Sequence, residues 1–131
     1  ALSGKKVTSI EISQSAVRDA RRIGALNDLS ADISYLRGDA AKVLPKIGNA
    51  GNSIFFVDPP RSGLGEKTAL MITGFAPREI VYLSCNPQTL KEDIKTIIEN
   101  GYKIVSATPY DLFPETKHIE TLVLFAAKQA K

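Results

Sequence analysis

Short apolar runs alternate with amphipathic stretches along this 131-residue chain, and the alternation constrains the fold more than any other feature. The runs that predict strands cover residues 6–12, 33–36, 53–57, 79–84, 102–107 and 118–126. The stretches that predict helices cover residues 14–26, 40–47 and 66–75, and a segment from Pro87 to the Asn100-Gly101 pair. Strands and helices in alternation are typical of a parallel α/β sheet, which is the predicted fold class.

The pattern also predicts which surfaces are buried and how the sheet ends. Ala16, Ala20 and Ile23 are predicted to share the buried face of the first helix. The apolar segment 53–57 predicts a strand that is buried on both faces. The connection 108–117 is too short for a crossover that carries a helix, so the last two strands are predicted to pair antiparallel.

Composition narrows the class of protein. The chain is 44% apolar and 24% charged, with a net charge of +3, which is ordinary for one small globular domain. A single cysteine excludes an internal disulfide framework and a cysteine-based metal cage, so we expect no metal and a cytoplasmic location. No apolar stretch is long enough to cross a bilayer. The mild positive charge is compatible with nucleic acid but is weak evidence for it.

Polar residues recur where the predicted strands end: Glu11, Asp39, Asp58 and Cys85. In open parallel sheets, ligands bind at the carboxyl ends of the strands. Each of the three acids alone is more often a helix cap or a turn residue than a ligand. Four polar ends on one edge of a sheet favour a binding site there.

Cys85 is the only cysteine, and it lies between the apolar run 79–84 and the pair Asn86-Pro87. Asn is a good N-cap and Pro suits the first helical position, so a helix is predicted to begin directly after the thiol. The positive end of a helix dipole favours a thiolate. The alternative is an inert cysteine buried in the core, which is the usual fate of a lone cysteine.

Three linked motifs extend this interpretation. They read Asp-Pro-Pro-Arg-Ser-Gly-Leu at 58–64, Leu-Ser-Cys-Asn-Pro at 83–87, and Asp-Leu-Phe-Pro at 111–114 with His-Ile-Glu-Thr at 118–121. In this order they closely resemble the catalytic domain of the RNA uracil-5-methyltransferases, and the resemblance covers essentially the whole chain. It implies a Rossmann-like methyltransferase domain that uses S-adenosylmethionine to methylate carbon 5 of a uridine in tRNA or 23S rRNA.

The resemblance implies roles for the polar residues near the cofactor. Glu11 matches the acid that holds the ribose hydroxyls, and a carboxylate suits a cis-diol because it accepts two hydrogen bonds. Asp39 matches the position near the adenine, and Asp58 matches the acid between the cofactor and the target base. Arg61 is expected to position the RNA or the base. A surface ion pair is an equally good interpretation of Arg61.

The resemblance also implies a catalytic pair. Cys85 matches the nucleophile that adds to carbon 6 of uracil, and Glu120 matches the base that removes the proton from carbon 5. The target base must be unstacked or flipped to reach them. Glu120 lies in the apolar run 119–125, where an unpaired buried carboxylate is costly. Its presence there therefore favours a functional role more than a surface glutamate would. His118, two residues earlier, is interpreted as a structural or RNA-proximal residue.

The sequence departs from the family at its N-terminal end. The family's first strand and its Gly-rich loop have no counterpart, so residues 1–131 are interpreted as a partial catalytic domain, the C-terminal portion of a longer protein. In the family that strand lies between the strands that here end at Glu11 and Asp58. We therefore expect unpaired sheet edges, self-association through them, weak cofactor binding and no turnover by this chain alone.

Two other functions stay open. Amino-methylating enzymes of nucleic acids use a related Asp-Pro-Pro motif followed by an aromatic residue, but here Arg61 follows Pro60 and a cysteine motif comes later. A non-catalytic fragment that binds only RNA or a partner is the second alternative. The sequence does not identify the target nucleotide, because specificity in RNA recognition depends on RNA shape and on other domains.

Overall fold

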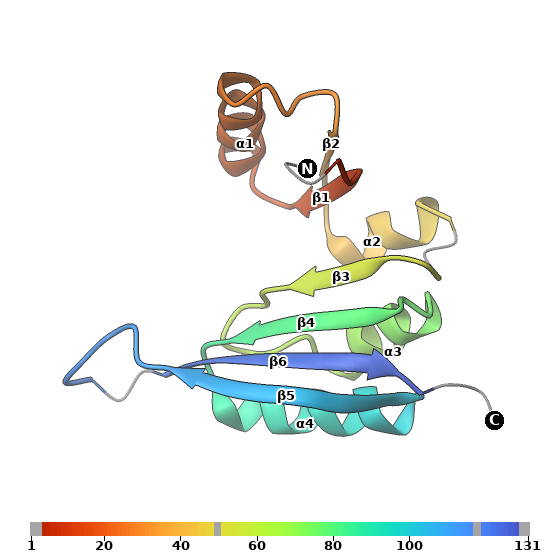
Figure 1. Cartoon of the computed structure of the whole chain (residues 1–131), viewed down its shortest axis with the longest axis vertical. Coiled ribbons are helices and arrows are strands. Elements are labelled where there is room, and N and C mark those ends of the chain that lie inside the picture. Colours follow the sequence, from red (N-terminus) through yellow and green to blue (C-terminus); the bar gives the residue numbers. More distant parts are fainter. Residues whose placement is uncertain (1–3, 49–50, 117–118, 129–131) are drawn as a thin grey trace. The chain divides into compact units, whose positions relative to one another are not determined.

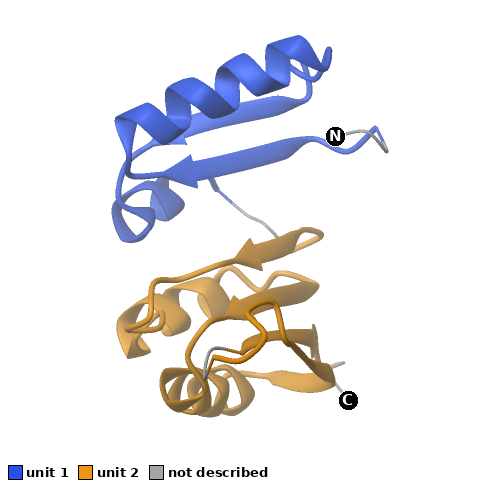
Figure 2. Ribbon diagram, turned by 90° about the vertical axis from the view of Figure 1, so that its left-hand side faces the viewer, with its two compact units in different colours: residues 1–48 blue, residues 49–131 orange. Residues whose placement is uncertain are grey.

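A computed structural model of the chain describes residues 4–48, 51–116 and 119–128. The chain forms two compact units, Ala1–Gly48 and Asn49–Lys131, which are coloured separately in Figure 2. Each unit contains its own sheet. None of the helices within the described ranges is long and apolar enough to cross a membrane.

Unit 1 is a small parallel two-stranded sheet with one long helix (Figure 1). Its elements are β1 (Val7–Glu11), α1 (Gln14–Leu26), β2 (Ile33–Arg37), α2 (Ala40–Val43) and the short 3₁₀ helix η1 (Leu44–Lys46). The two strands pair from Val7 opposite Ile33 to Glu11 opposite Arg37. This matches the elements predicted from the sequence.

Helix α1 begins where predicted, because the Ser13 hydroxyl caps it by accepting a bond from the Ala16 amide. Its predicted buried face was wrong, however. The buried residues of α1 are Val17 and Gly24, whereas Ile23 is 61% exposed. Gly24 faces Tyr35 of β2, whose hydroxyl lies so close that a Cβ atom at this position would require the Tyr35 side chain to shift. The helix therefore presents its smallest residue to the sheet.

Unit 2 is a four-stranded sheet in the order β3-β4-β6-β5 with two helices (Figure 1). Its elements are β3 (Ile54–Val57), α3 (Glu66–Gly74), β4 (Glu79–Ser84), α4 (Pro87–Glu99), β5 (Tyr102–Tyr110) and β6 (Glu120–Ala127). Strand β3 is parallel to β4, and β6 is antiparallel to both β4 and β5. The predicted antiparallel ending is confirmed, although β5 runs three residues further than the predicted end at 107.

The core of unit 2 lies between the sheet and α3 and α4, which cover one side of it (Figure 2). Along β4 the residues Ile80, Tyr82 and Ser84 are buried in alternation, as expected for a strand with one covered face. The largest fully buried side chains are Tyr82, Phe125, Ile80, Ile97, Val123 and Pro77.

Strand β3 differs from its prediction. An apolar run predicted burial on both faces, but Phe56 is 71% exposed and Ile54 is 50% exposed. Exposure alternates along the strand, so Ile54 and Phe56 lie on an open face while Phe55 and Val57 lie on the more covered one. On the covered face the ring of Phe55 packs against Phe75, the C-cap of α3, with ring centroids 6.0 Å apart.

Candidate active site

Cys85 lies where the sequence predicts, directly between the last residue of β4 and the N-cap of α4. The thiol is free and half-buried. Asn86 caps the helix, since its side-chain oxygen accepts the Gln88 amide at 3.1 Å, and Pro87 occupies the first turn. Cys85 is therefore not fully buried, unlike the core cysteine of the alternative interpretation.

Glu120 begins β6 close to the end of β4. The antiparallel register pairs Ser84 with Thr121, and each further step moves one residue along both strands in opposite directions. One step beyond this last pair are Cys85 and Glu120. Glu120 is half-buried at the start of the strand and paired with Tyr110 of β5, not buried within an apolar run as expected. His118 lies outside the described residues.

The loop 58–65 joins β3 to α3 and contains the first motif. Asp58 follows directly after β3 and is exposed. The Arg61 carbonyl accepts two bonds from the start of α4, at 2.8 Å from Asn86 Nδ2 and at 3.1 Å from Thr89 Oγ1. The backbone at Arg61 is thus fixed to the residue that follows Cys85, and the first two motifs meet in space.

Asp93 is a buried acid that the sequence interpretation missed. Its side chain is only 3% exposed on α4. Its Oδ2 accepts the Tyr82 hydroxyl at 2.5 Å and the Leu64 amide at 2.8 Å, and its Oδ1 accepts the Gly65 amide at 3.1 Å. Burial, together with the hydrogen bond and the charge of Asp93, raises the pKa of the Tyr82 phenol well above its usual value.

A signal for Asp93 was present in the sequence. The apolar stripe of α4 runs through Leu90, Ile94 and Ile97, and Asp93 lies on the same face, three residues after Leu90 and four before Ile97. A charged residue on the buried face of a helix needs a set of hydrogen-bond donors.

The two remaining acids lie together in unit 1. Glu11 ends β1, and its Oε1 accepts the Ser13 amide at 2.6 Å. The Gly38 amide donates to the Glu11 carbonyl at 3.0 Å, which joins the ends of β1 and β2. Asp39 caps α2 by accepting the Ala41 amide at 2.9 Å, as an acid after a strand often does. The four polar strand ends are therefore divided between two sheets, two on each.

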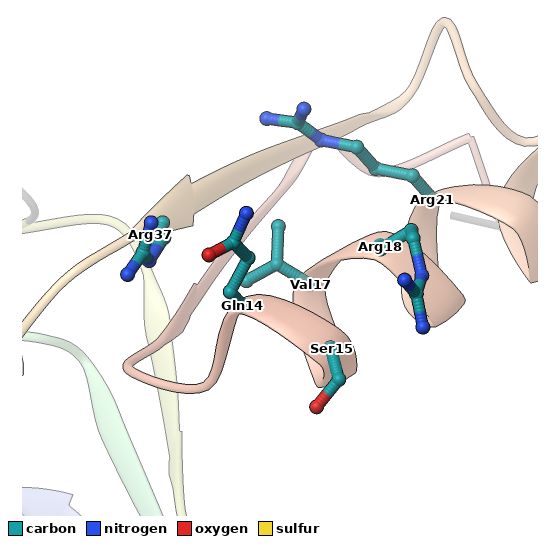
Figure 3. Close-up of a pocket in the computed structure, with 6 residues that line it drawn as sticks. All are labelled: Gln14, Ser15, Val17, Arg18, Arg21 and Arg37. Atoms are coloured by element: carbon teal, nitrogen blue, oxygen red, sulfur yellow. The ribbon is translucent and has the colours of Figure 1, made fainter.

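Unit 1 also has an arginine-lined hollow of about 600 Å³ beside α1 (Figure 3). Its lining residues are Gln14, Ser15, Val17, Arg18, Arg21 and Arg37. Arg21 donates to the Tyr35 carbonyl at 3.0 Å, and Arg37 extends from the end of β2 on the other side of Gln14. Sequence reasoning missed this feature because its arginines are not contiguous. Within the described ranges, no group of three or more His, Cys, Asp or Glu residues could hold a metal ion.

Known proteins identify the family. The family model described as tRNA (Uracil-5-)-methyltransferase matches residues 46–128, well over half of the chain. The chain belongs to this family. A Clostridium tetani protein that bears the name Uncharacterized RNA methyltransferase is 40% identical over 119 residues, covering 91% of this chain and 26% of that protein.

Solved structures agree with the uracil-5-methyltransferase family assignment. The Pyrococcus abyssi tRNA (uracil-54, C5)-methyltransferase in complex with S-adenosyl-L-homocysteine superimposes with a TM-score of 0.81 at 28% identity. The match covers 96% of this chain and 30% of that enzyme. A Streptococcus pneumoniae protein solved with S-adenosyl-L-methionine has the same fold, with a TM-score of 0.75 at 13% identity, covering 97% of this chain and 57% of that one.

These matches show the fold of the chain and how much of each relative the chain covers. The fold is that of the Rossmann-like, S-adenosylmethionine-dependent methyltransferases, as the sequence predicted. The chain spans about a quarter of the Clostridium relative and less than a third of the Pyrococcus enzyme.

Proposed function

We propose that this chain is the catalytic part of an enzyme that methylates carbon 5 of a uridine in RNA. S-adenosylmethionine, when bound, supplies the methyl group. The observation that carries the proposal is the register between β4 and β6, in which Cys85 and Glu120 occupy the next step after the Ser84–Thr121 pair. Facing residues of antiparallel strands have Cα atoms about 4.5–5.5 Å apart, which is close enough to act on one base.

The residues of the chain suit the chemistry. The Cys85 thiolate adds to carbon 6 of uracil, and the electron pair of the 5,6 double bond moves toward carbon 4 and its oxygen. Carbon 5 thereby becomes nucleophilic enough to accept a methyl group. The Glu120 carboxylate then removes the proton from carbon 5, the double bond forms again and the thiolate leaves. Cys85 directly precedes Asn86, the N-cap of α4, at the end of β4.

The chain also offers residues that fit the cofactor. Glu11 is a half-buried carboxylate at the end of a parallel strand, and one of its oxygens already accepts a backbone amide. A carboxylate accepts further hydrogen bonds, so Glu11 can hold the two ribose hydroxyls of S-adenosylmethionine. Asp39 would lie near the adenine, and Asp58 would lie between the cofactor and the target base.

An RNA substrate is supported by the family and by the arginines. Arg61 is exposed in the loop 58–65, whose backbone is fixed beside Cys85. The hollow lined by Arg18, Arg21 and Arg37 adds positive charge that attracts phosphates. The Pyrococcus enzyme acts on tRNA. We propose tRNA or 23S rRNA as the substrate, in the cytoplasm.

Trapping with RNA that contains 5-fluorouridine tests this function. Fluorine replaces the proton that Glu120 would remove, so a covalent adduct with Cys85 should persist after methylation. We expect the full-length natural protein, given S-adenosylmethionine, to form this adduct with tRNA or a 23S rRNA fragment, and Cys85→Ala to abolish it. If neither RNA yields an adduct, the function is a non-catalytic one, binding of RNA or of a protein partner.

The isolated chain should be inactive and should bind the cofactor weakly. The cofactor residues are divided, with Glu11 and Asp39 in unit 1 and Asp58 in unit 2, and the strands form two separate sheets. Isothermal titration of the 131-residue chain with S-adenosylmethionine should show little or no heat of binding. Tight binding would contradict this part of the proposal.

We also propose that the isolated chain associates with a second copy through β3. This edge strand carries Phe56 at 71% exposure and Ile54 at 50%. Edge strands with exposed apolar side chains pair readily with other strands. Sedimentation should show a dimer that Phe56→Lys shifts to monomer, while Leu70→Lys, on an exposed position of α3, should leave the dimer intact. A wild-type chain that stays monomeric at high concentration would exclude this association.

A further inference from the structure

A buried hydrogen-bond network centred on Asp93 connects the two motifs that flank the candidate active site. Asp93 is 3% exposed and Tyr82 is completely buried. The Asp93 carboxylate accepts one bond from the Tyr82 hydroxyl on β4 and two from backbone amides in the loop 58–65. A buried carboxylate is tolerated only when donors satisfy it, and here three donors do so.

The network holds the loop from two directions. Asp93 accepts the amides of Leu64 and Gly65 at the end of the loop, while Asn86 and Thr89 donate to the Arg61 carbonyl in its middle. The loop and the first two turns of α4 are therefore tied together at three places along the loop. Since Asn86 follows Cys85 directly, a movement of the loop also moves the segment that carries the thiol.

Gly63 shows how closely the loop approaches α4. Its φ of +76° lies in the left-handed region, and a Cβ atom there would come within 2.7 Å of Asp93 Oδ2 and 3.1 Å of Thr89 Cβ. Only glycine allows this approach. The loop thus rests directly on the carboxylate that holds it.

Asp93 also lies at the start of α3. The N-cap of α3 is Gly65, which has no side chain to accept an amide. The carboxylate of Asp93 accepts the amide of Gly65 itself, and its negative charge lies at the positive end of the α3 dipole. One side chain therefore fixes the start of α3, the loop before it and the strand that leads to Cys85.

We propose that Asp93 is a positioning residue of the active site, which holds the loop carrying Asp58 and Arg61 in a fixed relation to Cys85. The catalytic role of Asp93 rests on the proposed function. The hydrogen bonds from the loop to Asp93, called the clamp below, do not depend on it. Without the clamp, the thiol and the loop lose their alignment to a bound base. Misplacement of reacting groups by about 1 Å costs on the order of a hundredfold in rate, so the clamp matters even though Asp93 itself contacts no substrate.

Hydrogen exchange tests the clamp in the chain itself. Asp93→Asn keeps the size of the side chain but removes its charge and one acceptor oxygen. We expect the Leu64 and Gly65 amides to exchange at least about tenfold faster in this variant, since a hydrogen bond to a charged group is worth about that factor. Glu92→Gln, on the exposed neighbouring residue, is the matched control and should leave both amides unchanged. Unchanged exchange in Asp93→Asn would overturn the clamp.

Adduct formation in the full-length protein tests the positioning role. At saturating 5-fluorouridine RNA, Asp93→Asn should form the Cys85 adduct at least about tenfold more slowly per folded molecule, while the RNA concentration for half-maximal rate changes little. Tyr82→Phe removes one donor and leaves both loop bonds, so it should show a smaller loss and serves if Asp93→Asn folds poorly. A normal rate in both folded variants would overturn the positioning role. Absence of an adduct in the wild type would instead overturn the proposed function and leave the exchange result standing.

Discussion

The two units differ in the size of the buried core that each one contains. In unit 2, a set of large side chains from β4, β6 and α4 is completely buried, and buried polar groups such as Asp93 are satisfied. In unit 1, the described residues that are buried are only Val17, Gly24 and Leu44. Unit 2 is a domain core in its own right, whereas the two strands of unit 1 make a sheet too small to be stable alone.

The candidate residues divide along the same line. Cys85 directly follows β4 and Glu120 begins β6, both in unit 2, whereas Glu11 and Asp39 lie in unit 1. The two residues proposed to act on the base therefore belong to the better-packed unit, which suits a reaction that needs fixed geometry.

The largest expected effect comes from core truncation in each unit. Phe125→Ala in unit 2 removes a completely buried ring and should cost about 3–5 kcal/mol of unfolding free energy. Val17→Ala in unit 1 should cost no more than about 1.6 kcal/mol, the value of two buried methylene groups. Urea denaturation followed by circular dichroism measures both. Equal losses would show that the two units have equally developed cores.

The second effect depends on pH and belongs to unit 2. Burial and Asp93 raise the pKa of Tyr82 above its ordinary value of 10.0. The folded state holds this proton more tightly than the unfolded state, so the stability from Tyr82 is complete below pH 10 and declines as the pH rises above it. We expect a slope of up to about 1.4 kcal/mol per pH unit, which Tyr82→Phe should reduce. Identical slopes in urea denaturation of the two proteins would contradict the assignment.

A smaller effect is expected at the helix of unit 1. Alanine normally stabilises a helix interior relative to glycine by about 0.5–1 kcal/mol. At Gly24, however, an added methyl group would meet the Tyr35 hydroxyl and force that side chain to shift, so Gly24→Ala should destabilise by about 1 kcal/mol. Gly74→Ala in α3 is the matched control, because a Cβ there meets no neighbour within 4 Å. A rise in melting temperature for Gly24→Ala would show that Tyr35 moves aside freely.

The smallest effect concerns RNA affinity in unit 1. Replacing Arg18 and Arg37 in the hollow with glutamine should weaken RNA binding of the full-length protein. The salt dependence of binding should fall by about one unit of slope for each phosphate that the variant no longer neutralises. Lys91→Gln, on the exposed face of α4, is the control for general charge. Filter binding at several salt concentrations measures the slopes. An unchanged slope would mean that the hollow binds no phosphate.

Sequence reasoning succeeded where a signal is local. The capping residues Ser13 and Asn86 and the Pro87 position fixed the starts of α1 and α4, and the short final connection fixed the antiparallel ending. It failed where burial depends on a distant partner. Gly24 of α1 lies against Tyr35 on β2, and Phe56 lies on the face of β3 that is left open.

For the candidate active site, the sequence by itself determined the family, the polar residues that are candidates and the location of Cys85 between a strand and a helix N-terminus. These follow from motifs and caps, which are short-range patterns. Only the tertiary structure decided that Glu120 begins β6 one register step from the Ser84–Thr121 pair, and that Asp93 holds the loop 58–65. Strand register and a buried hydrogen-bond network join residues that are far apart in the chain, and no local pattern encodes which partners will meet.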